Sequence, residues 1–395
     1  MVTILDAWSW GLNITIYNWS VIGGIVMNRK LGWSAAVLAA GLLVGGTVFP
    51  VGTSNAANID KRMVSHSNGN TVILKLNGVI KQQQGLLIDG KTWVPVTFLR
   101  DVLKMPVSYD ASSKTYSIGQ DYRQLNLSIY SDGVISNING FYLNDDEAKL
   151  VNGRLYVPFQ WVKNYLGYQG DWNGATKRLN IVPSKENGII LTSVTSNKDS
   201  SEAKINLKYP EISYSSNTTA ENAINEALKQ DALAFNESIK KYVQERNTVQ
   251  EIGLQSQPYE FMSSYIVTYN QNNVLSLITE HYEYTGGAHG MTYRKGYTFS
   301  LNDGKLLSLE DLFGKDEHFE KQLNDKISAK LNATPGYFGG FEELGDHPDF
   351  YLQQGMLKVF FQLYEYTPYV AGFPELSFSF DSLLPKGSSP FDSLK

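Results

Sequence analysis

The chain has no cysteine among its 395 residues. This absence excludes disulfide cross-links, thiolate zinc sites, cysteine nucleophiles and a lipid anchor attached to an N-terminal cysteine. An excess of basic residues is also missing, because 34 lysines and arginines stand against 39 aspartates and glutamates and leave a net charge of −5. A nucleic-acid partner would call for a basic face, so none is expected.

Histidine is scarce as well, and its placement offers little chemistry. The five histidines are His66, His281, His289, His318 and His347. On a strand, His281 and the neighbouring Glu280 would point to opposite faces and form no ready site. No Gly-x-Ser-x-Gly nucleophile elbow occurs either, although a Ser–His–acid triad stays open. We therefore expect that the chain is not an enzyme and that it binds no metal ion and no other cofactor.

The residues that are present describe a folded, β-rich protein. Hydrophobic residues make up 42% and aromatic residues 12% of the chain, which excludes wholesale disorder. The 24 tyrosines, with only 18% charged residues, favour sheets with polar surfaces. At this length two or three domains are expected, each with its own core.

An export signal is expected at residues 27–57. A short basic stretch, MNRK, precedes an apolar run at residues 31–51. Ser54 and Ala56 then place small residues where signal peptidase would cleave after Ala56. An uncleaved membrane anchor is the alternative, since the run approaches the length of a bilayer span. In either case we expect the rest of the chain to be extracytoplasmic, either secreted or anchored in the cell envelope through residues 31–51.

Residues 1–26 do not suit this arrangement, because they are rich in tryptophan and lengthen the segment ahead of the signal. We interpret them as a mis-called N-terminal extension, with translation beginning at Met27. Contact with a membrane is expected only through the N-terminal segment.

Two segments repeat with a constant spacing of 63 residues, since Gly153 follows Gly90 by 153 − 90 = 63. A gapless offset over this length indicates two copies of one supersecondary unit. Each copy contains the pattern Gly-x-x-x-Val-Pro. The further identical pairs are Val94-Pro95 with Val157-Pro158, Leu103 with Leu166, Lys114 with Lys177 and Ile118 with Ile181.

Each copy, at about residues 70–120 and 133–183, is predicted to run strand, turn, strand, helix, turn, strand. Asp89-Gly90 and Asn152-Gly153 are typical of hairpin turns, and the proline that follows each second strand suits the first turn of a helix. The first copy is expected to enter a loop at residues 109–110. The predicted fold is therefore a duplicated module of antiparallel sheet plus helix.

This module resembles the stalk domain named after the N-terminal region of copper amine oxidases, over residues 70–183 within a domain at 58–184. The resemblance implies an exported protein with a stalk for spacing or wall contact. It does not imply copper, because no histidine lies between His66 and His281. Several aromatic side chains could stack on sugars, but core packing is the expected role. They are Trp93, Trp161, Tyr168 and Trp172.

The C-terminal half is predicted to form a second, two-part α+β region. Its long strands alternate apolar and polar residues, as half-buried antiparallel strands do. A capping box at residues 218–221 opens a long amphipathic helix, and a second apolar stripe follows near residue 325. The strands are expected at residues 188–194, 203–209, 261–269, 274–284, 294–301, 354–362, 364–368 and 376–380. The two helical stripes are Ile224, Leu228, Phe235, Ile239 and Val243, and Phe319, Leu323, Ile327 and Leu331.

The most informative motif is Tyr-Thr-Gly-Gly-Ala-His-Gly at residues 284–290. Glycine tolerates positive φ and lets other groups approach closely, so three glycines around one histidine indicate an unusual backbone. One interpretation is an active-site or ligand loop centred on His289. The other is a tight corner between two strands, which is favoured because no acid or nucleophile stands nearby in the sequence.

Three motifs in order carry a second resemblance: this loop, the segment 301–313 and the segment 366–375. Over residues 187–385 the chain resembles the extracytoplasmic domain shared by lysozyme-sensing anti-sigma factors of the RsiV type and the non-catalytic part of peptidoglycan deacetylases of the PdaC type. We divide it into a PdaC-like subdomain at 187–275 and an RsiV-like subdomain at 276–385. A tail follows at 386–395.

The activities of these relatives are not expected here. The anti-sigma factors carry a charged, helical sigma-binding segment ahead of the membrane span, whereas the present N-terminal segment is apolar and aromatic. The deacetylases need a paired-histidine motif, and no His-x-x-x-His occurs. The resemblance therefore implies a non-catalytic binding protein of the cell envelope, with a lysozyme-like protein or cell-wall glycan (peptidoglycan) as its partner.

The expected binding edge combines the loops at residues 282–290 and 366–372. Tyrosine suits a rigid, amphipathic contact surface, although packing within the sheet is an equal alternative. Two other functions stay open, an accessory substrate-binding module of a peptidoglycan-modifying system and a purely structural surface protein. The candidate ligand-binding residues are Tyr282, Tyr284, Gly286, Gly287, His289, Tyr366, Pro368 and Tyr369.

Overall fold

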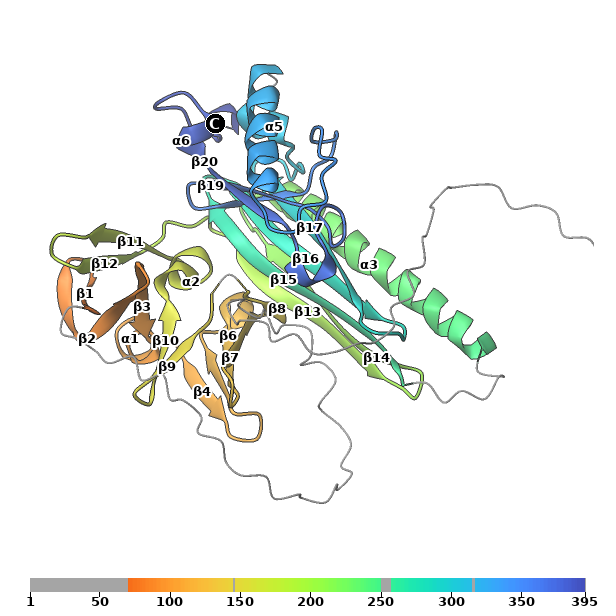
Figure 1. Ribbon diagram of the computed structural model, residues 1–395, viewed down its shortest axis with the longest axis horizontal. Helices are drawn as coiled ribbons and strands as arrows, with labels where there is room; N and C mark the ends of the chain where they lie inside the picture. Colours follow the sequence, from red (N-terminus) through yellow and green to blue (C-terminus); the bar gives the residue numbers. More distant parts are fainter. Residues whose placement is uncertain (1–69, 145, 250–256, 315–316, 395) are drawn as a thin grey trace, which may run out of the picture. The chain divides into compact units, whose positions relative to one another are not determined.

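The computed structural model describes residues 70–394, apart from residues 145, 250–256 and 315–316. The predicted extension (1–26) and export segment (27–57) lie outside the described residues. Within the described part, twenty strands form four sheets, with helices packed against them (Figure 1). This mixture of mainly antiparallel sheets and few helices confirms the predicted α+β class. No helix in this part is both long enough and apolar enough to cross a bilayer.

The N-terminal part is built from two sheets and two short helices, α1 (Val96–Asp101) and α2 (Phe159–Asn164). Its strands are β1 (Thr71–Leu76), β2 (Val79–Ile88), β3 (Lys91–Pro95), β4 (Val107–Asp110), β5 (Thr115–Ile118), β6 (Leu125–Ile129), β7 (Val134–Ile138), β8 (Phe141–Tyr142), β9 (Lys149–Val151), β10 (Arg154–Pro158), β11 (Tyr168–Asn173) and β12 (Arg178–Pro183). One sheet has the order β11-β12-β1-β2-β3-β10-β9 and the other the order β4-β5-β6-β7-β8.

The predicted duplication is visible in the elements. Strand β10 starts 154 − 91 = 63 residues after β3, and α2 starts 159 − 96 = 63 residues after α1. Both hairpin turns lie in the left-handed region, with φ of 51° and 76° at Asp89 and Gly90 and of 49° and 73° at Asn152 and Gly153. A type I′ turn requires a positive φ at both central positions, which explains the Asp-Gly and Asn-Gly pairs.

The two copies are not self-contained, however. The closing strand β12 of the second copy pairs in parallel with β1 of the first copy. The closing strand β5 of the first copy joins β7 of the second copy through the interposed strand β6. Each copy therefore completes its sheet with the other. Residues 109–110 do not begin a loop as expected but end strand β4, where they pair with Tyr116 and Thr115.

The large aromatic residues of this part mostly form its core. Trp161 and Phe98 are fully buried, and Trp93 is 2% exposed. Core packing is therefore confirmed for Trp93 and Trp161. Trp172, on β11, is 41% exposed and does not share that role.

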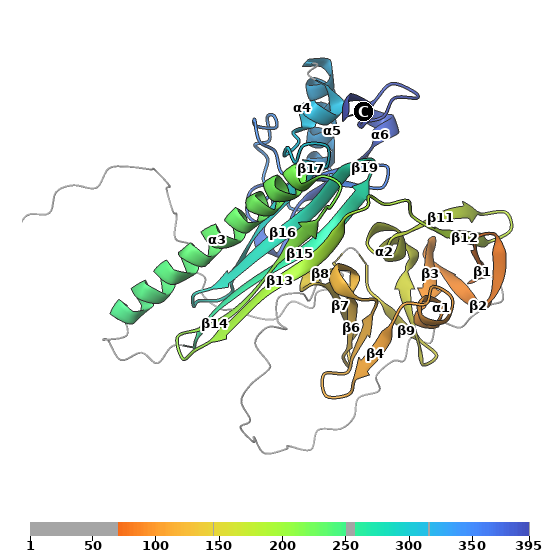
Figure 2. The same ribbon diagram turned by 180° about the vertical axis from the view of Figure 1, so that it is seen from behind.

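The C-terminal part is organised around a second five-stranded sheet. Its strands, in order, are β13 (Ile190–Asp199), β14 (Ala203–Ser213), β15 (Tyr259–Gln271), β16 (Val274–Tyr284) and β17 (Met291–Ser300). Helix α3 (Thr218–Val249) lies along one face of this sheet, as both ribbon views show (Figures 1 and 2). The sheet continues across residue 275, so the two predicted subdomains share it. The predicted apolar stripe of α3 is buried at Ile224, Leu228, Phe235 and Ile239.

A three-stranded sheet covers the middle of the other face. It consists of β18 (Phe350–Gln353), β19 (Met356–Phe360) and β20 (Glu375–Ser379). The expectation of half-buried strands is therefore wrong here, since Ser276 and Thr298 are 0% and 1% exposed. The hydroxyls of Ser276 and Thr298 form a 2.8 Å hydrogen bond with each other, and Ser276 Oγ also accepts a 3.0 Å hydrogen bond from the Leu352 N–H. A Cβ at Gly296 would lie 2.0 Å from the Phe350 carbonyl oxygen, so only glycine allows this approach.

Two short helices and one longer helix complete the C-terminal part. They are α4 (Leu309–Phe313), α5 (Glu317–Asn332) and α6 (Phe380–Leu383). The predicted stripe of α5 is buried at Phe319, Leu323, Ile327 and Leu331.

Two local predictions are wrong. Helix α3 is capped by Asn217 rather than by a threonine, because the Ala220 N–H donates to Asn217 Oδ1 at 3.2 Å. Residues 364–368 form turns instead of a strand. The φ of 67° at Tyr364 takes the backbone out of the extended region there.

One buried ion pair links the two sheets of the C-terminal part. Arg294, on β17, donates to Glu280 Oε1 on β16 from Nε at 2.9 Å and from Nη2 at 2.7 Å. Its Nη1 lies 3.6 Å from Glu375 on β20, and Glu375 pairs with Lys358 on β19 at 3.0 Å. The guanidinium also lies 4.1 Å from the ring centroid of Phe373. Because the Arg294 side chain is only 10% exposed, water cannot replace these contacts.

Replacing Arg294 by methionine is expected to lower the free energy of unfolding by about 3–5 kcal/mol, because it leaves Glu280 buried without its cation. Chemical denaturation of the purified variant measures this loss. Arg178→Met is the matched control, since Arg178 is exposed and its loss is expected to cost less than about 0.5 kcal/mol. Equal stabilities of the two variants would contradict the structural role of the pair.

Candidate functional site

The loop between β16 and β17 contains the three glycines of the 284–290 motif. Gly286 and Gly287 have φ of 102° and 95°, a region that residues with a Cβ rarely adopt. The loop closes on itself, because the Tyr284 hydroxyl donates to the Gly287 carbonyl at 3.1 Å. A Cβ at Gly290 would lie 2.4 Å from the Tyr282 ring. The first two glycines therefore shape the turn, and the third admits a tyrosine.

His289 joins this loop to a second loop far along the chain. Its ring stacks on Tyr369 with the centroids 4.1 Å apart, and its Nε2 lies 3.2 Å from the Tyr364 hydroxyl. Its Nδ1 lies 2.8 Å from the Gly290 carbonyl oxygen, which also accepts a 3.0 Å hydrogen bond from the Tyr369 hydroxyl. The side chains of both loops are therefore held in place by specific contacts.

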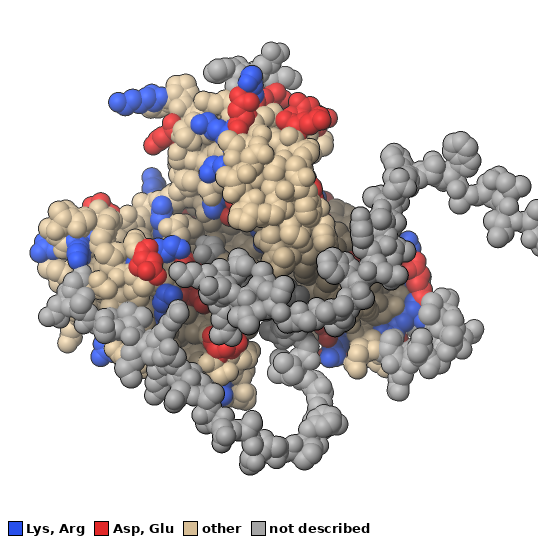
Figure 3. Space-filling model, in the orientation of Figure 1, with Lys and Arg blue, Asp and Glu red and all other residues tan. Residues whose placement is uncertain are grey.

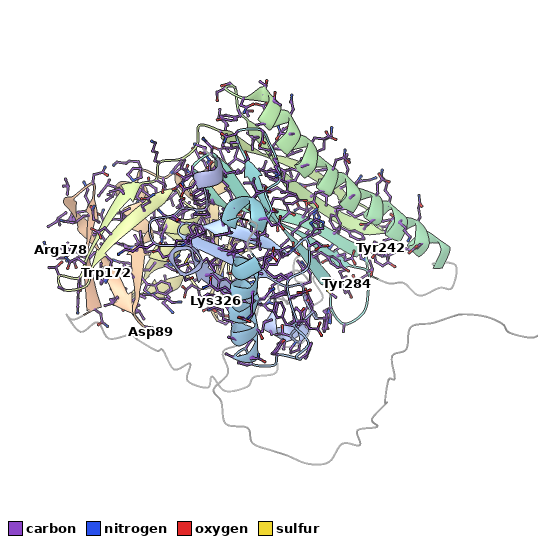
Figure 4. The ribbon with its side chains drawn as sticks, turned by 90° about the horizontal axis from the view of Figure 1, so that it is seen from above. Asp89, Trp172, Arg178, Tyr242, Tyr284 and Lys326 are labelled. Atoms are coloured by element: carbon purple, nitrogen blue, oxygen red, sulfur yellow. The ribbon has the colours of Figure 1, made fainter. Side chains whose placement is uncertain are left out.

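We call this surface the tyrosine edge. Tyr284 is the last residue of β16, and Figure 4 shows it near Tyr242 of helix α3. In Figure 3, the surface of the C-terminal part that grey atoms leave visible includes a broad area with few charged side chains. The tyrosine edge consists of Tyr282, Tyr284, His289, Tyr364 and Tyr369.

The structure separates the predicted site residues into two groups. Tyr282, Tyr284, Gly286, Gly287, His289 and Tyr369 belong to the tyrosine edge or its loop. Tyr366 instead packs edge-on against Phe361, with the centroids 4.8 Å apart, and Pro368 leads into the 3-10 turn Tyr369–Ala371. These two residues belong to the second loop but not to the tyrosine edge itself. Tyr364 was missed by sequence reasoning, because its position was assigned to a strand.

Burial raises the pKa of two tyrosines of the tyrosine edge, Tyr282 and Tyr369. It raises the pKa of Tyr282 to about 12, and the nearby Glu260 carboxylate adds to that shift. Burial also raises the pKa of Tyr369, with a further contribution from Tyr364. Tyr282 and Tyr369 therefore offer hydroxyl groups and aromatic faces rather than charge.

The tyrosine edge does not have the geometry of a catalytic site. In the described part, the His289 ring hydrogen-bonds to a backbone carbonyl and to a tyrosine hydroxyl, and no acid orients it. A general base of the triad type would need such an acid and a nucleophile within hydrogen-bond distance. The described residues also contain no group of three or more histidine, aspartate or glutamate side chains that could hold a metal ion.

A second histidine does have an acid partner, which the sequence did not reveal. His281 Nε2 on β16 lies 2.8 Å from Asp231 Oδ2 on α3, and the Thr279 hydroxyl donates to the same oxygen at 3.1 Å. The His281 ring packs 4.4 Å from Phe235. Its Nδ1 is buried and has no hydrogen-bond partner among the described residues, so no nucleophile contacts it. The pair therefore fastens α3 to the sheet. Glu280 points to the opposite face, as expected, where it binds Arg294.

Three family models match this chain in succession. The copper amine oxidase N-terminal domain matches residues 62–181, deacetylase PdaC matches residues 196–292, and the protein of unknown function DUF3298 matches residues 310–381. This order confirms the stalk domain followed by a PdaC-type domain that the motifs predicted. The three matches fit an extracytoplasmic, non-catalytic module.

Two solved structures of DUF3298 proteins are similar to part of this chain. The protein from Bacteroides fragilis is 18% identical, with 52% of this chain and 97% of that chain covered and a TM-score of 0.41. The protein from Pseudomonas aeruginosa is also 18% identical, with 50% and 94% covered and a TM-score of 0.37. No curated protein matches the sequence significantly.

The Asp231–His281 pair predicts a pH dependence of stability. Burial by itself would raise the pKa of Asp231, but the hydrogen bond and charge of His281 outweigh it and hold that pKa below its usual range. The ionised carboxylate then contributes stability above the ordinary aspartate pKa of about 3.9, and this contribution is lost as the pH falls through the folded pKa. Asp231→Asn should be less stable at pH 7 by about 1–3 kcal/mol.

Urea unfolding between pH 3 and pH 7 measures the free energy of unfolding of the wild type and of Asp231→Asn. We expect the wild type to lose stability more steeply than Asp231→Asn at the acid end. Asp89→Asn, at the exposed β2–β3 turn labelled in Figure 4, is the control and should follow the wild type. Parallel curves for the wild type and Asp231→Asn would contradict the role of the pair.

Proposed function

We propose that this chain is a non-catalytic binding protein of the cell envelope, in which the tyrosine edge binds a lysozyme-like protein. The observation that carries the proposal is the contact between His289 and Tyr369, which brings two loops 80 residues apart (369 − 289 = 80) into one aromatic surface. The stalk module would act as a spacer or wall contact. Secretion, or anchoring through residues 31–51, would place the protein outside the cytoplasm.

The side chains of the tyrosine edge suit recognition of a protein. Tyrosine contributes a large amphipathic contact at low cost in side-chain entropy, which is why it is common at binding sites. The hydrogen bonds at Gly287 and Gly290 hold the rings in place before a partner arrives, and such preorganisation favours binding. Two neighbouring apolar side chains are strongly exposed, Val370 at 83% and Phe338 at 60%.

Charge favours a basic partner. The chain carries a net charge of −5, and Glu365 is exposed beside Tyr364 in the second loop. Complementary charge raises the rate of encounter and helps to exclude wrong partners. A positively charged, lysozyme-like protein meets this condition better than a neutral surface does.

Peptidoglycan is the second candidate for the tyrosine edge. Aromatic rings can stack on sugar faces and their hydroxyls can accept hydrogen bonds from sugars, and the PdaC model that matches residues 196–292 is described as a deacetylase. In that case the chain would be an accessory substrate-binding module of a wall-modifying system. A purely structural surface protein would bind neither ligand.

A retention assay with immobilised full-length protein separates these functions. The wild type should retain hen lysozyme, and Val370→Lys should weaken retention by roughly tenfold or more, because it removes an apolar contact and places a positive charge against a positively charged partner. Leu150→Lys is the matched control, since Leu150 is 54% exposed on β9 of the stalk module. Co-sedimentation with peptidoglycan sacculi is measured in parallel. Retention on sacculi alone favours the second candidate, and retention on neither ligand refutes both.

A further inference from the structure

The N-terminal part has a groove that lies apart from the tyrosine edge. It has a volume of about 460 Å³ and lies on the seven-stranded sheet, where β2, β10 and the ends of β3 and β9 form most of its lining. Side chains on a strand point alternately to the two faces of a sheet. The pairings Thr71–Leu86, Leu86–Trp93, Tyr156–Pro95 and Arg154–Val151 place all these residues on one face. A groove of this size can hold a small ligand or part of a chain.

The floor of the groove is apolar. Leu86, Val151 and Tyr156 are 7%, 8% and 6% exposed, and they pack together with Trp93 in a small cluster. Lys149 lies 4.8 Å above the Trp93 ring and helps to close that cluster. An apolar floor can accept the C–H face of a ring-shaped ligand.

The rim of the groove is polar and carries unused hydrogen-bonding groups. Gln82, Gln84, Asn152 and Arg154 line it and are exposed. Among the described residues, none of these four side chains has a hydrogen-bond or ion-pair partner. A side-chain amide offers two donors and one acceptor, so the rim can both donate to a ligand and accept from it.

The neighbouring sheet shows that polar side chains in this part of the molecule can satisfy one another. Across β5, β6 and β7, Ser117 donates to Asn126 at 2.8 Å and Asn126 donates to Asn137 at 3.2 Å. Thr115 and Ser128 are likewise 2.8 Å apart. That sheet face has used its hydrogen-bonding groups internally, whereas the groove has not.

We propose that the groove binds a neutral carbohydrate chain. A sugar presents hydroxyls that both donate and accept, which matches the amides of the rim, and a C–H face that matches the apolar floor. An extended peptide is a poorer fit, because it gains affinity by pairing with a free strand edge, and the groove lies on the face of the sheet, where β2, β3 and β10 are each paired on both sides and β9 alone has an unpaired edge. An acidic or basic ligand is also a poorer fit, since Arg154 is the single charged side chain of the lining.

This site goes beyond the function proposed for the tyrosine edge and does not depend on it. If the partner of the tyrosine edge were a protein, the groove would still give the stalk module its own binding site for a polysaccharide. The stalk would then be a second binding site rather than a passive spacer.

Isothermal titration of full-length protein with triacetylchitotriose, cellotriose and tri-alanine tests the proposal. We expect binding of at least one of the two sugars and none of tri-alanine. The double variant Gln82→Ala/Gln84→Ala should weaken sugar binding by about tenfold, because two exposed hydrogen-bonding side chains are removed. A preference for chitotriose over cellotriose would show that the acetamido groups contribute.

Matched controls separate the groove from the rest of the molecule. Gln160→Ala removes an exposed amide on α2, and Arg178→Ala removes an exposed cation at the start of β12 (Figure 4), so neither should change sugar binding. Val370→Lys should impair the tyrosine edge but leave sugar binding intact. Failure of both sugars to bind, binding of tri-alanine instead, or unchanged sugar binding by the double glutamine variant would overturn the proposal.

Discussion

Arg294 links the layers of the C-terminal part, and the placement of the tyrosine edge depends on that link. Its guanidinium is shared between Glu280 on the five-stranded sheet and Glu375 on the three-stranded sheet. The side chain of Gln362 extends the connection, because it donates to the Arg294 carbonyl at 2.7 Å and to Asp349 at 2.8 Å. Residue 362 directly precedes the loop of Tyr364 and Tyr369. A buried charge network of this kind tolerates few alternative arrangements, since every group left without its partner would be costly.

The tyrosine edge follows from this constraint together with three glycines. Gly286 and Gly287 let the β16–β17 loop turn, and Gly290 lets Tyr282 approach the backbone. His289 then has a defined task, which is to hold Tyr369 and Tyr364 against the loop. Its bonding to a carbonyl and a phenol gives this conspicuous histidine a positioning role between the two loops.

Several features were predictable from sequence because they depend on local periodicity. The 63-residue repeat, the Asp-Gly and Asn-Gly turns and the buried stripes of α3 and α5 all agree with the structure. Others were not, because they depend on contacts between distant residues. The exchange of closing strands between the stalk copies cannot be seen in a repeat alignment. The strands β15 to β17 look half-buried in sequence, and only the second sheet explains their buried serines and threonines.

The sequence by itself determined the order of the modules, the turn chemistry and the absence of thiol and paired-histidine chemistry, because each is a property of residue type and spacing. It also identified most of the tyrosine edge, since glycine and tyrosine are unusual enough to mark both loops. Only the tertiary structure decided that His289 meets Tyr369, that His281 meets Asp231 from 50 residues away, and that Tyr366 points inward. The physical reason is that a side chain's role depends on which partner the packed sheets bring within hydrogen-bond distance, and no local pattern encodes that distance.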